Sequence, residues 1–480
     1  MALTIAAAFF AALLLILARA KPGALKAVET ASRAPALLLA GGAAASLIWR
    51  TAGAPFAPPE WVAAGADVLL AALGFAAAAQ FRITRLASVC PASFRLTVGG
   101  APVFLIVCGL AAFILIPQLS LAGAFLLAGA LTLNGAAFDR RAVTGAPTPA
   151  TLKAAVRLES AAILALGVPV AVMLEAAATA APQGMPLITP VFEAARGFFV
   201  AFAVGGSLGL AAAHYGNKLT NKKKAAALTA ASGCAAFLIA PVFGGHPVIA
   251  AVAAGLLWGE QTVALSMARV RLRRTVERVA APVAYLGFGL ALGPRLFEAD
   301  LLTVLFAAAA VTIMRAGPRI AALKKTTLPR ESQMLVAWFG GAPGAASALF
   351  LISLLDAPSI PAQDAVLTVG ALAVTLGVFA ARLTSRPLVT LLLKQTVVAR
   401  KRAMFAGQRQ PLLRVFNGLT GDLRINAALA DLRALHKQPQ DVFTVGQVAR
   451  KRLLGHAAKP QILLLGEAFA DAAFFLSNLD

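Results

Sequence analysis

Uncharged apolar stretches of about 20 residues recur along the whole chain, and they constrain its fold more than any other feature. The stretch LTVGGAPVFLIVCGLAAFILI, residues 96–116, is one of them. A helix of that length crosses about 30 Å of lipid hydrocarbon. Only 13% of the 480 residues are charged, whereas soluble domains carry about 25%. We therefore predict an all-α polytopic membrane protein that lies in the lipid bilayer.

The apolar stretches predict about thirteen membrane-spanning helices, each near the length that a bilayer requires. The first has no basic residue before its apolar run, so we expect it to be retained rather than cleaved as a signal peptide. The predicted spans are residues 2–19, 34–50, 61–81, 96–116, 121–138, 155–178, 197–215, 225–243, 247–264, 280–297, 299–315, 333–355 and 365–393.

Basic residues gather after every odd-numbered span, for example Lys222, Lys223 and Lys224 after the seventh. The loops on the other side hold mainly acidic residues: Glu60, Glu193, Glu298, Asp300, Asp356 and Asp364. Because positively charged loops stay in the cytoplasm, we expect the N-terminus outside and the C-terminus inside. We also expect a multi-pass protein of the cell inner (plasma) membrane.

The net charge of +23 does not predict nucleic-acid binding, because the basic residues lie in loops and no basic platform with interleaved aromatic residues is present. The sequence contains no nucleophile–base arrangement and no phosphate-binding glycine loop at a strand–helix junction, so we do not expect an enzyme. The three cysteines are scattered without metal-ligand spacing, so we expect no metal and no cofactor.

Two domains are predicted. Residues 1–395 form the membrane domain, and residues 396–480 form a basic juxtamembrane segment followed by a small helical cytoplasmic domain. The run KQTVVARKRAMFAGQRQ favours a solvated segment near anionic headgroups. This C-terminal region could also bind a protein partner.

Charged side chains at membrane depth are costly and usually occur in pairs. Glu159 begins the sixth predicted span, and Arg315 ends the eleventh, so both should lie near the inner face. We predict a structural ion pair between them, the alternative being that each reaches the interface separately. Asp67, in the third span, could line a vestibule or hydrogen-bond to a neighbouring helix.

Two predicted spans contain sequences that interrupt helices, namely LTLNGAAF with Asn134 and Gly135, and WFGGAPGAAS with Ala342 and Pro343. Broken helices build binding sites in many secondary transporters. Small residues also permit close helix packing, and composition alone does not separate the two interpretations.

The order of several motifs resembles the monovalent cation:proton antiporter family, the sodium/proton exchangers, over most of residues 60–395. The matching segments are FLIAPVFGGHPVIAAVAAGLLWG, VERVAAPVAYLGFGLALG, TIMRAGPRI and LPRESQMLVAWFGGAPGAAS. The resemblance implies antiporter-like inverted repeats, two broken core helices and a homodimer.

The departures from the family pattern lie where the family binds its ion. The Thr-Asp-Pro motif of the fifth span falls near Asn134 and Gly135. In the Glu-Ser-x-x-Asn-Asp motif, Glu159 and Ser160 match, but Ile163 and Leu164 replace Asn-Asp. An Arg-Gly motif is replaced around Ala342 and Pro343. The resemblance therefore implies a transport core, made by these residues, that lacks its ion-binding aspartate.

These departures favour a transport-silent scaffold or sensor with a cytoplasmic tail over ordinary sodium/proton exchange. A secondary transporter, proton-coupled or solute-carrying, with a non-standard site around Asn134 is the alternative, and relocated groups such as Asp67 could serve it. An apolar plug formed by Ile163 and Leu164 would favour the silent protein.

Overall fold

The computed structural model describes residues 35–51, 59–80, 82–134, 150–180, 188–219, 222–262, 266–324, 330–357 and 360–405, with Thr326 and Leu328. The first predicted span, Gly135, and residues 406–480 of the predicted C-terminal domain lie outside this part. The chain divides into two compact units, Met1–Arg141 with Ala155–Arg386, and Ala142–Ala154 with Pro387–Asp480. The candidate functional site lies in the first unit.

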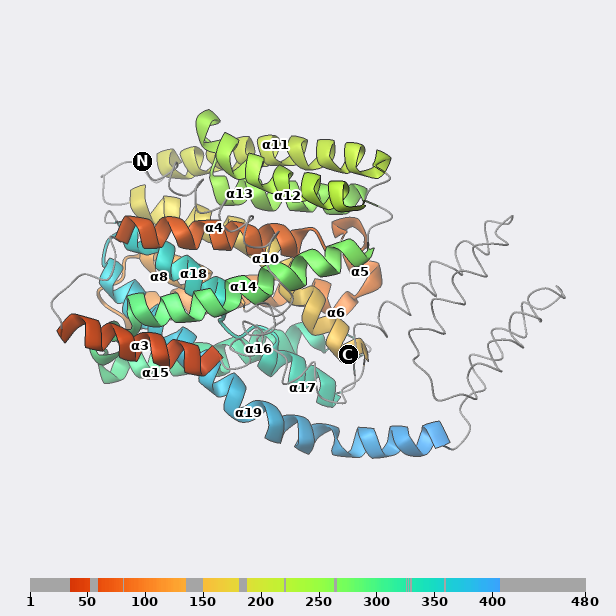
Figure 1. Cartoon of the computed structure of the whole chain (residues 1–480). Helices are drawn as coiled ribbons and strands as arrows, with labels where there is room; N and C mark the ends of the chain where they lie inside the picture. The colour runs from red at the N-terminus through yellow and green to blue at the C-terminus, as the bar shows by residue number, and fades with distance from the viewer. Residues whose placement is uncertain are drawn as a thin grey trace. The chain divides into compact units, whose positions relative to one another are not determined.

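Helices make up nearly all of the described chain (Figure 1). Their bounds are α3 Pro35–Thr51, α4 Pro59–Ala78, α5 Ile83–Val89, α6 Pro91–Arg95, η1 Leu96–Gly100, α7 Ala101–Leu115, α8 Leu121–Thr132, α10 Ala150–Ala180, α11 Ile188–Lys218, α12 Lys222–Ile239, η4 Ala240–Phe243, α13 Pro247–Gln261, α14 Ser266–Leu292, η5 Gly293–Phe297, α15 Leu301–Val311, α16 Ile313–Leu323, α17 Arg330–Phe339, α18 Ala345–Ser353, η6 Leu354–Asp356 and α19 Gln363–Phe405. The prediction of an all-α chain is confirmed for these residues.

Seven helical segments of the described chain are long and apolar enough to cross a membrane, and four shorter apolar helices accompany them. The seven are Glu60–Ala78, Pro91–Leu115, Ala155–Thr179, Phe192–Lys218, Val276–Phe297, Leu301–Leu323 and Gln363–Thr384. A multi-pass membrane protein is therefore confirmed, whereas the number of thirteen spans stays a prediction.

One predicted boundary differs from the structure in a way that affects the site. The eleventh span was expected to end at Arg315, but helix continues to Leu323 and is interrupted instead at Thr312. Thr312 has φ −108° and ψ −88°, which separates α15 from α16. Three basic residues within ten positions made Arg319 and Lys324 look like loop residues, because charge normally marks the end of a span.

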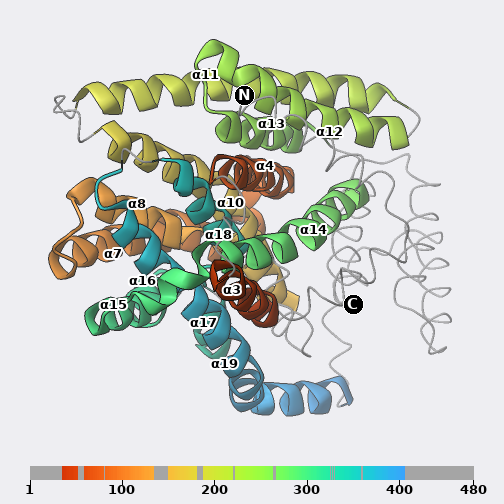
Figure 2. The ribbon, with the colours of Figure 1, turned by 60° about the vertical axis from the view of Figure 1, so that its left-hand side comes forward.

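Helices α11, α12 and α13 pack side by side (Figures 1 and 2), and α13 also contacts α4. Two glycines of α11 allow the close approach, because a Cβ on Gly205 would overlap the carbonyl of Ala250, and one on Gly209 the carbonyl of Ala254. Small residues at such interfaces let two membrane helices bring their backbones together.

The ends of α8, α17 and α18 determine where regular helix stops near the site. Ser120 begins α8 by accepting a hydrogen bond from the backbone N–H of Gly123 at 3.1 Å, a normal N-cap. At its other end α8 stops at Thr132, and Leu133 is already extended, with φ −64° and ψ 119°. Helices α17 and α18 are separated by the five residues from Gly340 to Gly344.

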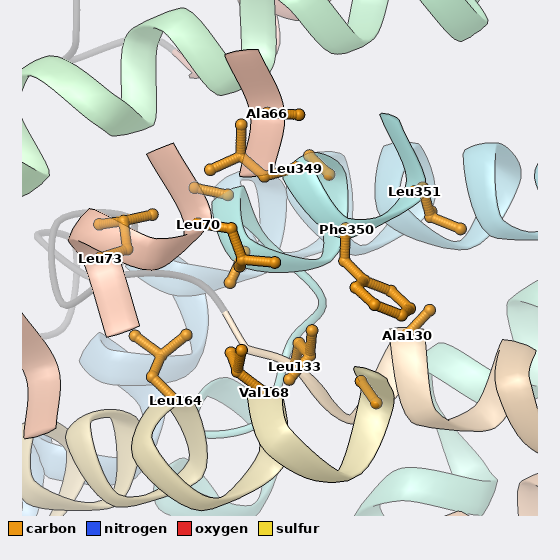
Figure 3. Close-up of a cluster of buried hydrophobic side chains, with 14 of the residues drawn as sticks. Ala66, Leu70, Leu73, Ala130, Leu133, Leu164, Val168, Leu349, Phe350 and Leu351 are labelled. Carbon is orange, nitrogen blue, oxygen red and sulfur yellow. The ribbon is translucent and has the colours of Figure 1, made fainter. Parts of the chain in front are cut away.

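Figure 3 shows the hydrophobic core between α4, α8, α10 and α18. Leu164 and Val168 of α10 point toward Leu73 of α4 and Leu133 at the end of α8. All four side chains are at most 1% exposed and belong to one buried cluster.

Candidate functional site

The interrupted segments cross one another in the interior. Asn134, just after α8, forms an isolated antiparallel bridge with Pro343, between α17 and α18. Interrupted helix at membrane depth leaves backbone groups without intrahelical partners, so it is tolerated only inside the protein or along a cavity. The structure thus brings together two of the residues that the sequence analysis assigned to the transport core. We refer to Leu133, Asn134 and residues 340–344 as the crossing.

Neutral polar side chains satisfy the backbone at the crossing. The amide of Asn134 donates through Nδ2 to the carbonyl of Gly340 at 3.4 Å and accepts at Oδ1 from the Ser160 hydroxyl at 3.4 Å. Ser347 of α18 donates to the carbonyl of Leu133. Asn134, Ser160 and Ser347 have no exposed surface. These side chains therefore bind one another and the broken backbone.

Glu159 of α10 is fully buried and forms an ion pair with Arg319 of α16, with 2.5 Å between Oε1 and Nη1. This differs from the predicted pairing with Arg315. Arg315 lies one turn earlier on α16 and donates through Nη2 to the carbonyl of Trp338 at 2.5 Å. Because side chains four residues apart share a helix face, both arginines can reach the same region, and Arg319 is the one that reaches Glu159.

Arg319 also binds the end of α17. Its Nε donates to the carbonyl of Ala337 at 3.1 Å, and its Nη2 to that of Val336 at 3.0 Å. The last carbonyls of a helix lack intrahelical partners and carry partial negative charge, which a guanidinium compensates. Gly340 and Gly341 permit the close fit, since a Cβ on either residue would overlap the guanidinium of Arg319.

Ile163 and Leu164 are 3% and 1% exposed, respectively, and Leu164 lies in the hydrophobic cluster of Figure 3. Leu164 is therefore surrounded by hydrocarbon. Ala342 is half-buried beside Pro343, within the crossing. Of the predicted core residues, only Gly135 lies outside the part of the chain that the structure describes.

Sequence reasoning missed Arg319 and Ser347. The four-residue spacing of Arg315 and Arg319 was a usable signal, because it places both on one face of a helix. Ser347 had no such signal, since its role depends on how closely α18 approaches the end of α8.

Elsewhere, Asp67 of α4 interacts with Ser353 and Asp356, and it is the electrostatic neighbour of Glu175 on α10. These three residues, Ser353, Asp356 and Glu175, are distinct from Asn134, Ser160 and Ser347 at the crossing. Among the described residues, no group of three His, Cys, Asp or Glu side chains could hold a metal ion.

Residues 5–389 match the family described as sodium/hydrogen exchanger, transmembrane. The fold is similar to that of the sodium proton antiporter MjNhaP1 from Methanocaldococcus jannaschii at pH 8, with a TM-score of 0.57 and 16% identity over 79% of this chain and 99% of that one. An electron-microscopy structure of the same antiporter gives a TM-score of 0.49 at 15% identity, over 68% of this chain and 83% of that one. No curated protein matches the chain significantly.

These comparisons bear out the resemblance that the motifs carried. The family match spans most of the chain, and sodium/hydrogen exchangers are membrane transporters rather than enzymes. The chain therefore belongs to the sodium/hydrogen exchanger family.

Proposed function

We propose that this chain uses the exchanger fold without exchanging monovalent cations for protons, and that it acts in the membrane as a transport-silent scaffold or sensor. One observation carries the proposal. Leu164, which takes the place of the aspartate in the family motif, is 1% exposed and packs among hydrocarbon side chains.

The chemistry of exchange explains why this substitution matters. A cation that sheds its water needs several oxygen ligands, and charged or polar groups at membrane depth normally provide them. Coupling to protons further requires a group that binds and releases a proton. The three side chains that hydrogen-bond to one another and to the backbone of the crossing, Asn134, Ser160 and Ser347, are neutral amides and hydroxyls.

The charged side chains near the crossing bind other parts of the protein. Glu159 is paired with Arg319, which is itself bound to the end of α17. The amide of Asn134 is bound to Gly340 and Ser160. Because these polar groups already have internal partners, they support a structural role for the crossing better than a site for a neutral solute.

The test is cation-driven dissipation of a pH gradient in proteoliposomes, followed with a pH-sensitive dye. We expect no response of the wild-type chain to sodium, potassium or lithium chloride. Monensin, which exchanges sodium for protons, is added at the end to show that each preparation held its gradient. Sodium-, potassium- or lithium-dependent proton movement by the wild type would refute the proposal.

Two variants define what the crossing lacks. Leu164→Asp supplies a carboxyl group, and Leu164→Asn supplies a side chain of the same size that does not titrate. If the missing carboxyl is the reason for silence, only Leu164→Asp can gain activity. Equal activity in both variants would point to leakage caused by a disrupted core.

We further propose that the chain is a homodimer in the cell inner (plasma) membrane, with its N-terminus outside and its C-terminus inside. The alternation of basic and acidic loops supports this orientation. In the same proposal, the cytoplasmic region 396–480 binds a protein partner.

A further inference from the structure

The guanidinium of Arg319 has the surroundings of a bound monovalent cation. Its Nη1 lies 2.5 Å from Oε1 of Glu159, and it donates to the carbonyls of Val336 and Ala337 at 3.0 and 3.1 Å. One carboxylate and two carbonyl oxygens thus surround a single positive charge. The residue is 3% exposed, so water does not compete strongly for these oxygens.

The surrounding oxygens come from helices other than α16, which carries Arg319: Glu159 lies on α10, and the two carbonyls lie on α17. The carbonyls are those of the last turn of α17, where the helix dipole places about half a negative charge. Half-helix ends of this kind hold cations in membrane transporters. A guanidinium presents several N–H donors in a fixed planar arrangement, and here Nε, Nη1 and Nη2 each meet one of these oxygens.

Glu159 provides the second observation. Its side chain is completely buried, and its Oε2 accepts no hydrogen bond from the described residues. This oxygen faces Gly340, where an added Cβ would lie 2.5 Å from it. A buried carboxylate oxygen without a donor is costly, and it is directed at the same end of α17 that Arg319 binds.

We infer that Glu159 and the end of α17 form a cation site that the chain fills with its own Arg319, and that this site takes a free alkylguanidinium when the Arg319 side chain is removed. This inference rests on the proposed function and deepens it. An exchanger must release its cation, whereas the guanidinium of Arg319 is covalently attached to α16. Gly340 and Gly341 lie directly against this guanidinium.

Arg319→Ala removes all atoms beyond Cβ, and ethylguanidinium supplies the same set of atoms. We expect the melting temperature of the purified Arg319→Ala chain to fall by several degrees. Millimolar ethylguanidinium chloride should then raise it in a concentration-dependent way, as a ligand of the folded state does. Wild type should not respond, and tetramethylammonium chloride at equal concentration should have no effect on either protein.

Two further variants locate the effect. Arg319→Ala combined with Glu159→Gln should lose the response, because the carboxylate is a ligand. Arg315→Ala, which deletes a guanidinium one turn away, should not respond. Should Arg319→Ala aggregate on purification, the fraction that elutes as a single peak after solubilisation with and without ethylguanidinium gives the same comparison.

The inference is overturned if ethylguanidinium leaves Arg319→Ala unchanged, or if it stabilises wild type or the double variant equally. None of these outcomes depends on transport. Sodium/proton exchange by the wild type would refute the proposed function and leave this site standing, whereas absence of rescue would refute the site alone.

Discussion

At the scale of single residues, the site depends on which arginine meets Glu159. Arg319 makes the ion pair and two carbonyl contacts, whereas Arg315 donates to Trp338. Removing one member of a buried pair costs about 3–5 kcal/mol, mostly because the other charge stays buried without its partner. Deletion alone cannot distinguish the two arginines, since both are buried, but their coupling to Glu159 can.

We predict that Glu159→Gln and Arg319→Met are coupled in a double-mutant cycle, whereas Glu159→Gln and Arg315→Met are nearly additive. Residues in direct contact show interaction energies of about 0.5–3 kcal/mol. The measurement is unfolding of the four proteins of each cycle in one detergent. Stronger coupling for Arg315 than for Arg319 would mean that the pairing is the one expected from the sequence.

A second prediction concerns Gly340. In Gly340→Ala the new methyl group would overlap Arg319 Nη2 and the Val336 carbonyl and press on Glu159, so it must displace the ion pair. We expect the free energy of unfolding to fall by about 1–3 kcal/mol, as it does when a side chain is added to a well-packed core. Gly317→Ala on α16 is the matched control.

Among the described residues, and apart from the backbone of its own helix, nothing lies within 4 Å of a Cβ at Gly317. Alanine there should be neutral or stabilise α16 by up to about 1 kcal/mol, because glycine is a poor helix former. Thermal unfolding of both variants provides the measurement. Equal effects of the two substitutions would show that Gly340 is not pressed against the ion pair.

At the scale of elements, the sequence predicted the apolar helices well and their interruptions less well. Apolar length identifies α4, α7 and α10, although α4 carries Asp67 and α10 carries Glu159 and Glu175. The motif WFGGAPGAAS marked the interruption between α17 and α18, because Gly and Pro disrupt helices locally. The break at Thr312 had no such mark, and the basic residues that follow it, Arg315, Arg319 and Lys324, made Arg319 look like a loop residue. Which arginine enters the core depends on how α16 packs against α17, which no local pattern contains.

Packing of α11 against α13 can be tested in the same way. A Cβ at Gly205 would meet backbone atoms of Ala250, which cannot move aside without separating the two helices. We predict that Gly205→Ala destabilises the chain by about 1–3 kcal/mol. Gly216→Ala, on the same helix, should have little effect, because a Cβ there meets no other helix of the described chain within 4 Å. Similar melting temperatures of the two variants would contradict the close approach of α11 and α13.

At the scale of the whole molecule, the order of motifs was enough to predict the family, although only 16% of residues are identical to the antiporter of similar fold. That is possible because the fold depends on apolar length, small residues and a few buried polar contacts, which tolerate extensive substitution. Orientation is a different matter. The charge of the loops determines the orientation, and the packing of the helices inside the membrane gives no information about it.

Orientation can be tested across one span, Leu301–Leu323. Glu298 and Lys324 flank it, and both are exposed. In a chain whose Cys90, Cys108 and Cys234 are replaced by alanine, we predict that Glu298→Cys reacts with a membrane-impermeant maleimide in intact cells. Lys324→Cys should react only after permeabilisation, because basic loops stay in the cytoplasm. The reverse pattern would invert the molecule in the membrane, and the basic loops and region 396–480 would then face outside, where no cytoplasmic partner could reach them.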